Sequence, residues 1–452
     1  MKKMLCLFLC VLMVLTMVSC DNIFGAKAPK SAQELYDRVA MQMNAMDSIK
    51  TDISMSMILF VNGYEMKSES TGYIVENVNV EGDYYFYEES ILKLTSDALS
   101  LDETQKSIKA YHTGDYFIYN EQNGAVQKLY SPMTTEEMKE YLSKNSLTTF
   151  DLIKDCATKT FAKNKDGMWE LSCSGYTKLA IEEISEDMGL DDDMLSAEVM
   201  DMQLIMVVDK KYRATQMKID FVFEETKKMP SISMTMNFSQ YNEADVVLDF
   251  LDIDYTKVND IRMLSDIEEM LDARSESESG NFTLNIEETV RDPNGQSSVY
   301  MEDNTVSFGE DDEGYFYDID AVINKISYDI SYKKGKQTII SDYDFQDKAQ
   351  TEQEARDWIK SLIDVGYDPV IVTDIKDNGD GVYKLICDNP KTDVYEEYFE
   401  SNGGTLSSVK QTITVTIKDG SICSISNFVL AKGNIDPYGT VSLTLSKTIA
   451  FE

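Results

Sequence analysis

One eight-residue pattern occurs twice in the chain. Asp166-Gly-Met-Trp-Glu-Leu-Ser-Cys173 returns 214 positions later as Asp380-Gly-Val-Tyr-Lys-Leu-Ile-Cys387. In each copy an Asp-Gly turn precedes a strand on which an aromatic residue, a leucine and a cysteine alternate onto one face. A turn pair followed by alternation of this kind is typical of a β-hairpin.

Other features recur in the same order around this pattern. Capping-box motifs begin at Thr134 and Thr351, 217 positions apart, and turns centred on Asp209 and Asp419 lie 210 apart. Prolines before the last strands, Pro230 and Pro437, lie 207 apart. A spacing that drifts slowly is what duplication followed by changes in loop length produces. The sequence therefore predicts two tandem copies of one domain.

The first 20 residues form a separate segment. Lys2 and Lys3 precede an almost unbroken apolar run over residues 4–17, and Ser19 stands directly before Cys20. This is the pattern of a secretory signal, and it is too short for a membrane-spanning helix. The stretch Met17-Val-Ser-Cys20 resembles the lipobox of bacterial lipoproteins, although an ordinary signal peptide that contains a cysteine is the alternative. The resemblance implies cleavage after residue 19 and lipidation of Cys20.

The length of the chain indicates more than one domain, and its net charge excludes one class of partner. The residues after Cys20 are too many for one compact core, so we expect a tether over 20–30, a first domain over 31–248 and a second over 281–452. Residues 249–280 are expected to form a linker with a helix. Asp and Glu number 80 against 42 Lys and Arg, for a net charge of −38. Such a surface repels nucleic acid, which we exclude as a partner.

Alternating and helical patterns place the predicted elements. A capping box at Ser31 opens a helix, and a second predicted helix covers residues 178–200. Met55 and Met57 alternate along a strand over residues 53–61, and Met234 and Met236 alternate along one over 232–238. A helix is expected over 260–273 in the linker.

The order of these elements resembles the LolA/LolB lipoprotein-carrier superfamily, with its LppX and LprG relatives. The resemblance covers both copies and carries over no individual site residue. It implies an α+β fold: two tandem repeats of a curved antiparallel sheet, each a half-barrel with helices packed on its concave face. It also implies a hydrophobic cavity used for acyl chains or for sensing lipoproteins.

Methionine residues are the candidates for lining such a hydrophobic cavity. Six fall on faces expected to point inward: Met43, Met46, Met55, Met57, Met234 and Met236. Flexible thioethers suit a pocket that accepts variable lipid, so these six are the candidate ligand-binding residues. The alternative is that they simply fill a core, since apolar residues on inward faces usually do.

The cysteines after Cys20 are Cys156, Cys173, Cys387 and Cys423. Cys173 and Cys387 alternate in phase with core residues, and free cysteine is often buried, so we favour reduced thiols. Disulfides between residues 156 and 173 and between 387 and 423 are the alternative in an exported protein.

Catalytic constellations are not evident. His112 is the single histidine and has no nucleophile motif beside it. We find no His/Cys zinc motif, calcium loop or phosphate-binding glycine loop. We therefore predict a non-enzymatic protein without metal or cofactor, held by Cys20 on the extracytoplasmic side of the cell membrane, that binds or senses an acyl lipid or another envelope lipoprotein. The main alternative is an envelope interaction protein with filled cores and a protein partner. A carboxylate-based hydrolase is a weaker one.

Overall fold

The computed structural model describes residues 28–452, except 62–63, 79–83, 99, 123, 146–152, 154–155, 178–198, 224–229, 342, 389–392 and 437–438. The signal segment, Cys20, most of the tether and nearly all of the helix expected over 178–200 lie outside these residues. By its contacts the chain divides into two units. Unit 1 comprises residues 1–69, 96–100 and 145–244, and unit 2 comprises 70–95, 101–144 and 245–452. The predicted domain boundaries stay a prediction, because these units follow packing rather than order along the chain.

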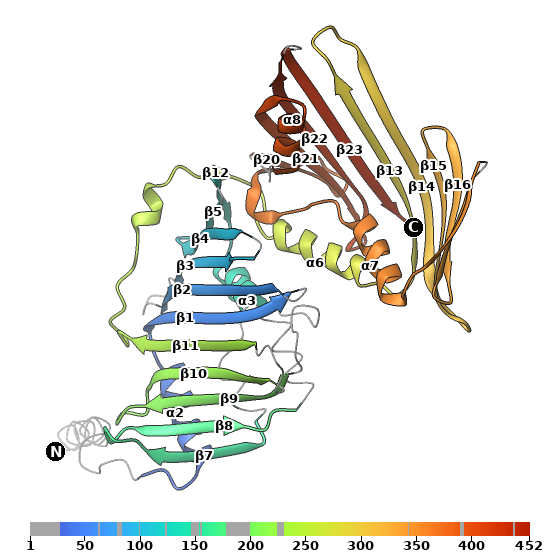
Figure 1. Cartoon of the computed structure of the whole chain (residues 1–452). Helices are drawn as coiled ribbons and strands as arrows, with labels where there is room; N and C mark the ends of the chain where they lie inside the picture. The colour runs from blue at the N-terminus through green and yellow to red at the C-terminus, as the bar shows by residue number, and fades with distance from the viewer. Residues whose placement is uncertain are drawn as a thin grey trace, which may run out of the picture. The chain divides into compact units, whose positions relative to one another are not determined.

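The first sheet has 12 strands in the order β12-β6-β5-β4-β3-β2-β1-β11-β10-β9-β8-β7 (Figure 1). Its strands are β1 (Ser48–Val61), β2 (Tyr64–Val78), β3 (Tyr84–Ser96), β4 (Leu101–His112), β5 (Asp115–Gln122), β6 (Ala125–Pro132), β7 (Thr158–Lys163), β8 (Trp169–Ser174), β9 (Val199–Val208), β10 (Ala214–Phe223), β11 (Ser231–Ser239) and β12 (Thr256–Lys257).

The second sheet has 11 strands in the order β18-β17-β16-β15-β14-β13-β23-β22-β21-β20-β19. Its strands are β13 (Gly280–Arg291), β14 (Ser297–Asp311), β15 (Gly314–Ile323), β16 (Ile326–Lys333), β17 (Lys336–Ser341), β18 (Phe345–Ala349), β19 (Val372–Asp377), β20 (Val382–Asp388), β21 (Gly404–Lys418), β22 (Ser421–Ile435) and β23 (Gly439–Phe451).

The two sheets share one topology. Apart from β12, each strand of the first sheet has a counterpart at the same place in the second, numbered twelve higher. In both, the first strand of the sheet pairs antiparallel with the last: Lys50 lies opposite Ser239 in β1 and β11, and Phe282 lies opposite Phe451 in β13 and β23.

The predicted α+β fold of two half-barrels covered by helices is wrong. The chain is mostly strand, in two large sheets with few helices among the described residues. The likeness to the lipoprotein-carrier superfamily rested on the order of elements along the chain, which does not determine how many strands join one sheet. Pairing of the first strand with the last brings the strands before and after the capped helix into a single sheet.

In unit 1, α2 (Ala32–Asn44) packs on one face of the sheet against β7 and β8. The expected cap is present, because the Ser31 hydroxyl accepts a hydrogen bond from the Glu34 N–H at 3.1 Å. Leu35 and Val39, one helical turn apart, are fully buried in a core with Leu171, Leu204 and other sheet residues. The helix therefore covers part of the apolar face of β7–β9.

In unit 2, a segment that we call the strap (residues 245–262) runs along β3–β6. It contains η1 (Asp249–Asp252) and β12, which pairs in parallel with β6. The Tyr85 hydroxyl donates to the Val247 carbonyl at 2.6 Å, and Phe250 packs on Phe117 with ring centroids 5.3 Å apart. The strap thereby covers the edge strand β6, whose free backbone groups would otherwise be open to pairing.

The other helical elements of unit 2 are α3 (Thr135–Asn145), α6 (Met263–Ser275), α7 (Glu352–Ile363), α8 (Asp393–Ser401) and the short η2 (Pro369–Ile371). α6 contacts α7 and β22, and α8 lies on β21 and β22 (Figure 1). Leu264 and Ile267 of α6 and Ile359 of α7 belong to one buried core with β3–β6 and the second sheet.

Candidate functional site

Five of the six candidate methionines lie on elements of unit 1 that share one core. Met43 is on α2, Met55 and Met57 are on β1, and Met234 and Met236 are on β11. Met46 follows the end of α2, where its N–H donates to the Met43 carbonyl at 3.3 Å, and it is not part of the core cluster.

Strand register aligns the sheet methionines in rows. Met55 lies directly opposite Met234, and Met57 lies opposite Ile232. Met236 lies between Ile53 on β1 and Met217 on β10. Because directly opposed side chains stand on the same face, the apolar side chains of β1, β10 and β11 form one continuous surface.

Sequence reasoning missed three methionines of the same surface: Met202, Met206 and Met217. Met206 lies opposite Met217, and Met202 lies opposite Phe221. All three are fully buried. The alternation of Met202, Leu204 and Met206 was the signal that could have found them. We call the seven sheet methionines the methionine face: Met55, Met57, Met202, Met206, Met217, Met234 and Met236.

Burial divides this face. The three methionines of β9 and β10 lie inside the core, whereas Met55, Met57, Met234 and Met236 are only partly buried. Met43, Met57, Met234 and Met236 pack against the buried cluster that α2 covers. The structure thus brings Met43 of α2 together with Met55 and Met57 of β1 and Met234 and Met236 of β11 at the edge of a core.

The position of α2 beside this face is fixed by polar contacts. The Arg38 guanidinium donates to the Tyr212 hydroxyl at 2.7 Å and to Glu34 at 2.5 Å, and it stacks 4.8 Å from the centre of the Tyr212 ring. Tyr212 lies in the β9–β10 turn with a positive φ of 62°. These contacts bind the helix to the sheet at the turn end of β9 and β10.

The chemistry of the methionine face is apolar and adaptable. Thioether side chains are unbranched and polarisable, so they repack around differently shaped apolar groups. Ionisable side chains do not interrupt the rows that join Met55, Met234 and Ile219. Such a surface can bind a hydrocarbon chain or an apolar side chain and has no acid, base or nucleophile.

A separate cavity of about 210 Å³ lies in unit 2 between α6 and the end of α7. Its walls combine charged and apolar side chains: Glu268, Leu271, Asp272, Ser275, Lys360, Ile363, Asp364, Val365 and Tyr367. None of the candidate methionines lines it. Its volume is below that of most pockets for small molecules.

Burial and like charge shift the pKa values around this cavity. Desolvation, followed by repulsion from Asp272, Asp368 and Glu269, raises the pKa of the Glu268 carboxyl. Desolvation lowers the pKa of Lys447, whose ammonium donates to the carbonyl oxygens of Ser361 and Asp364. Burial also raises the pKa of Tyr367, and its hydroxyl donates to the Leu264 carbonyl at 2.8 Å. The Tyr367 hydroxyl thus joins the loop after α7 to α6, and Lys447 of β23 holds the end of α7 and this loop.

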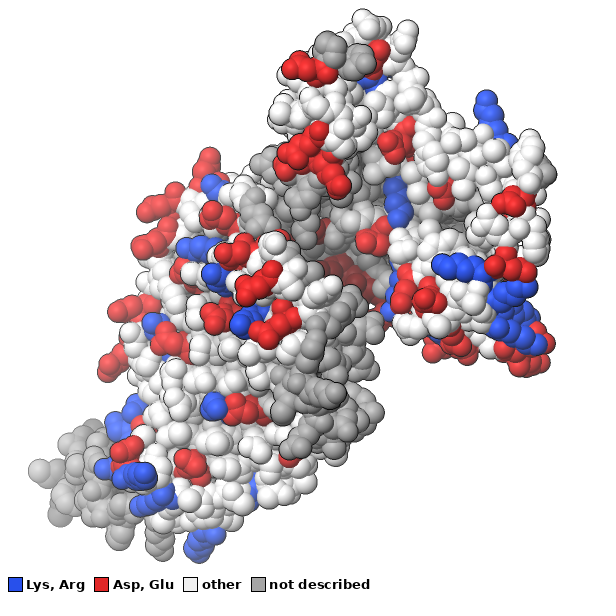
Figure 2. Space-filling view, in the orientation of Figure 1, with Lys and Arg blue, Asp and Glu red and all other residues white. Residues whose placement is uncertain are grey.

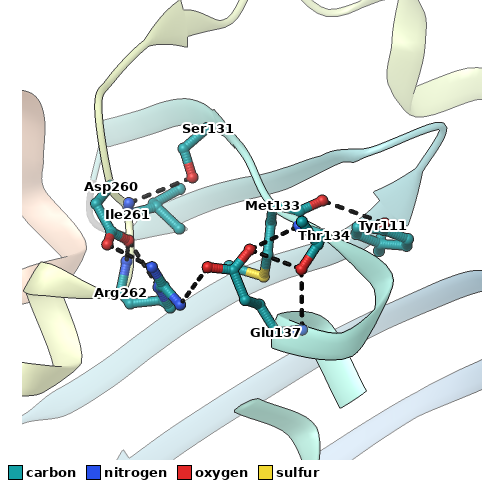
Figure 3. Close-up of polar contacts among 8 residues, drawn as sticks. All are labelled: Tyr111, Ser131, Met133, Thr134, Glu137, Asp260, Ile261 and Arg262. Atoms are coloured by element: carbon teal, nitrogen blue, oxygen red, sulfur yellow. Dashed lines mark hydrogen bonds and ion pairs between the residues drawn. The ribbon is translucent and has the colours of Figure 1, made fainter. Parts of the chain in front are cut away.

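A polar cluster joins α3 to the strap (Figure 3). The Thr134 hydroxyl and the Glu137 carboxylate form the expected capping box, with bonds of 3.2 Å and 2.8 Å to each other's N–H groups. Arg262 bonds both oxygens of Asp260, at 2.9 Å and 2.7 Å, and reaches Glu137 at 3.3 Å. This arrangement satisfies a helix terminus and anchors the strap, so its role is structural.

The remaining candidate residues lie away from these sites or outside the described residues. Cys20 lies outside the described residues. His112 ends β4, with its ring edge-on to Tyr85 at 6.1 Å. Within the described ranges, no three His, Cys, Asp or Glu side chains are arranged to hold a metal ion, and no helix is both long and apolar enough to span a membrane.

Acidic side chains are spread over the visible surface and outnumber Lys and Arg (Figure 2). Many of the basic side chains stand next to acidic ones, as Lys333 does between Asp311 and Glu313 at 2.8 Å and 3.0 Å. The field of this face is therefore negative and locally mixed.

Neither a protein-family model nor a curated protein matches the sequence. Among solved structures, a DUF1329 family protein from Desulfovibrio piger is 10% identical, with 48% of this chain and 95% of that chain covered and a TM-score of 0.18. A putative AttH from Nitrosomonas europaea is 8% identical, covering 89% and 93% at a TM-score of 0.13. Pseudomonas aeruginosa OprD is 6% identical, covering 90% and 95% at 0.12. Likenesses this slight carry no argument about fold or function.

Proposed function

We propose that the chain is a non-enzymatic binding protein of the cell envelope, tethered on the extracytoplasmic side of a membrane through lipidated Cys20, and that its methionine face binds a hydrophobic ligand such as an acyl chain. The observation that carries the proposal is the partial burial of Met55, Met57, Met234 and Met236 at the edge of a closed core. Side chains needed only for packing are expected to be as buried as Met202, Met206 and Met217.

The geometry supports an apolar ligand over a polar one. The rows of β1, β10 and β11 present methionine and isoleucine without an intervening charge. Burying apolar surface contributes about 25 cal/mol per Å², so an acyl chain laid along several methionines gains enough to bind without a polar anchor.

Native mass spectrometry with palmitate as the probe tests this proposal. The protein is expressed from Asp21 onward, so that lipid on Cys20 cannot be mistaken for ligand. We expect the wild type to bind palmitate, and Met57→Gln with Met234→Gln to reduce binding at least tenfold. A buried amide left without a hydrogen-bonding partner costs about 1–3 kcal/mol.

The matched control is Met41→Gln, because Met41 lies on α2 but is 62% exposed. This variant should bind palmitate as the wild type does. Met57→Leu should also bind, because it keeps the volume and polarity of the site. Equal binding by all four proteins, or no uptake by the wild type, would contradict the proposal.

The tether is tested independently. Cys20→Ser should move the full chain from the membrane fraction to the soluble fraction of cells, because a covalent lipid contributes about 0.8 kcal/mol of membrane affinity per buried methylene. Retention of this variant on membranes would exclude Cys20 as the anchor.

A second candidate function is protein binding by the outer face of the second sheet. Six large apolar side chains on this face are exposed by 42–61%: Val299, Met301, Val322, Ile340, Phe345 and Phe428. Ile340 lies directly opposite Phe345, on the edge strand β18. Exposed apolar residues that share one face of a sheet and extend to its edge are typical of interaction surfaces.

Photo-crosslinking in cells separates the two candidates. A crosslinking residue at Phe345 should capture a protein if this face is an interface. The same residue at Tyr64, which is also exposed on a strand (48%), is the control. Adducts at both positions, or at neither, would remove the support for a specific interface.

A further inference from the structure

Cys156 and Cys173 stand next to each other in unit 1. Cys156 lies two residues before β7 and is 6% exposed, and Cys173 lies near the end of β8 and is 2% exposed. Both are thiols, and the two side chains are hydrogen-bonding neighbours within one buried cluster. They are 17 positions apart in the sequence, on either side of the β7–β8 hairpin.

The two cysteines differ in how firmly their backbones are held. The chain after Cys173 is fixed by Asp201, whose carboxylate accepts the N–H groups of Gly175 at 3.0 Å and Tyr176 at 3.2 Å. Cys156 leads into β7, the last strand of its sheet, which has a neighbour on one side. The Ala157 N–H donates to the Gly175 carbonyl at 3.2 Å. A covalent link here would bind an edge strand to a rigid neighbour.

The second sheet stabilises the equivalent edge differently. Cys387 lies opposite Val372 on β19, as Cys173 lies opposite Lys159 on β7. Cys156 lies three residues before Lys159, the partner of Cys173. The residue three before Val372, the partner of Cys387, is Pro369, so Pro369 takes the place of Cys156 in the second copy. The carbonyl oxygens of Pro369 and Val372 accept hydrogen bonds from the Gln127 side chain at 2.6 Å and 2.7 Å. One copy thus holds this edge with a glutamine, and the other places two thiols there.

We propose that Cys156 and Cys173 are a modification site that becomes an intramolecular disulfide, fastening the edge strand β7 to β8. The two thiols lose two protons and two electrons as the sulfur–sulfur bond forms. The electrons pass to the disulfide of an oxidant, either a thiol–disulfide oxidoreductase or a small disulfide such as oxidised glutathione, which leaves as two thiols.

Burial determines when the reaction takes place. Desolvation, and next the Cys156 thiol, raise the pKa of Cys173 well above its usual range. The thiolate that must attack the oxidant is therefore scarce in the folded protein. We expect the bond to form while the chain folds and then to resist reductants until the protein is unfolded.

The occurrence of this bond in cells rests on the proposed extracytoplasmic location, since disulfides persist in oxidising compartments. Its chemistry does not depend on the ligand or the tether. A test on the purified protein therefore fails or succeeds independently of the proposed function.

The experiment refolds the purified chain in glutathione buffers that are either mostly oxidised or mostly reduced. All remaining thiols are then alkylated in denaturant, and the trypsin digest is analysed by mass spectrometry. In the oxidised sample we expect residues 155–159 linked to residues 166–178, at a mass lower by two hydrogen atoms than the sum of the two peptides. In the reduced sample both peptides should be alkylated.

Cys387 is the internal control, because its counterpart position holds Pro369, and its peptide should be alkylated in both samples. Separate alkylated peptides for residues 156 and 173 after oxidative refolding would overturn the proposal. So would linkage of either residue to Cys387 or Cys423.

Cys156→Ser gives a second readout. The wild type should melt higher in oxidising than in reducing buffer, by roughly 5 °C for a loop of this length, whereas the Tm of Cys156→Ser should be the same in both buffers. If Cys156→Ser fails to fold, Cys173→Ala replaces it, because alanine fills a buried thiol position without a polar atom. Equal Tm values of the wild type in the two buffers would also contradict the proposed bond.

Discussion

Gln127 is a buried polar side chain that forms hydrogen bonds with three other residues. It is 1% exposed on β6, accepts a hydrogen bond from Asn120 at 2.6 Å and donates to two carbonyl oxygens near η2. Every polar atom of the amide therefore has a partner, which is the condition for burying such a group without a large penalty.

We predict that Gln127→Leu lowers the free energy of unfolding by about 1–3 kcal/mol, because it leaves the Pro369 and Val372 carbonyls and the Asn120 amide unpaired in the core. Urea denaturation measures the change. Gln203→Leu is the control, since Gln203 is exposed on β9 and its replacement should change the free energy by less than about 0.5 kcal/mol. Equal effects of the two substitutions would show that the Gln127 contacts are not stabilising.

Because the pKa of Glu268 is raised in the folded protein, the free energy of unfolding depends on pH. A carboxyl whose pKa is higher in the folded state than in the unfolded state stabilises the fold while it is protonated, below the unfolded pKa. That stabilisation is lost as the pH rises through the folded pKa.

Glu268→Gln, which is neutral at all pH values, should therefore raise the Tm at neutral pH. The gain should shrink as the pH falls through the raised pKa of the folded state and disappear below the unfolded pKa of about 4. Because the side chain is partly exposed, the gain is expected to be small. Thermal melts at several pH values measure it, with Glu276→Gln as the control, because Glu276 is an exposed carboxyl directly after α6. A gain that is independent of pH would contradict this account.

Among the elements, α3 depends on contacts at its first turn. The Thr134 hydroxyl accepts the Glu137 N–H, and Glu137 in turn accepts the Thr134 N–H and contacts Arg262 of the strap (Figure 3). Two roles therefore meet at Glu137, one in capping and one in the ion pair.

Thr134→Ala should lower the free energy of unfolding by about 1 kcal/mol, because the Glu137 N–H loses its partner. Glu137→Gln separates the two roles, since glutamine keeps the capping hydrogen bond and loses the charge. It should destabilise less than Thr134→Ala, because exposed ion pairs contribute little. Urea denaturation of both variants checks the order, and the reverse order would mean that the Arg262 pair matters more than the cap.

Several elements were predictable from local patterns. The capping boxes at Thr134 and Thr351 are present, and the helix expected over 260–273 is α6. Such motifs involve groups within a few residues of each other, so the sequence contains the whole interaction. Met202 and Met217 of the candidate site were missed, although both lie in the β9–β10 hairpin, where alternation along each strand marks the buried face.

At the scale of the whole molecule, the exposure of each methionine predicts the sequence in which the methionines are oxidised. Met41 and Met301 are 62% and 48% exposed, whereas Met202, Met206 and Met217 are fully buried. Hydrogen peroxide should oxidise the exposed pair first, the partly buried Met57 and Met234 next and the buried three last. Peptide mass spectrometry over time measures the order, and early oxidation of Met206 would contradict the described packing.

The sheets could not be predicted from the sequence. Alternation along each segment indicates a strand, but it does not say which strands are neighbours or whether they form one sheet. The contact between Gln127 and the region before β19 joins residues more than 240 positions apart. Strand pairings that are equally distant in sequence produce sheets of 12 and 11 strands instead of the expected half-barrels.

Pairing of the first strand with the last has a consequence for biosynthesis. Lys50 on β1 meets Ser239 on β11, so one edge of β1 has no partner until nearly 190 further residues have emerged. β13 waits in the same way for β23. Contacts this distant in sequence form slowly, and unpaired strand edges aggregate. A chain of this topology is therefore exposed to aggregation until its last strands have been synthesised and paired, whatever it binds once it is folded.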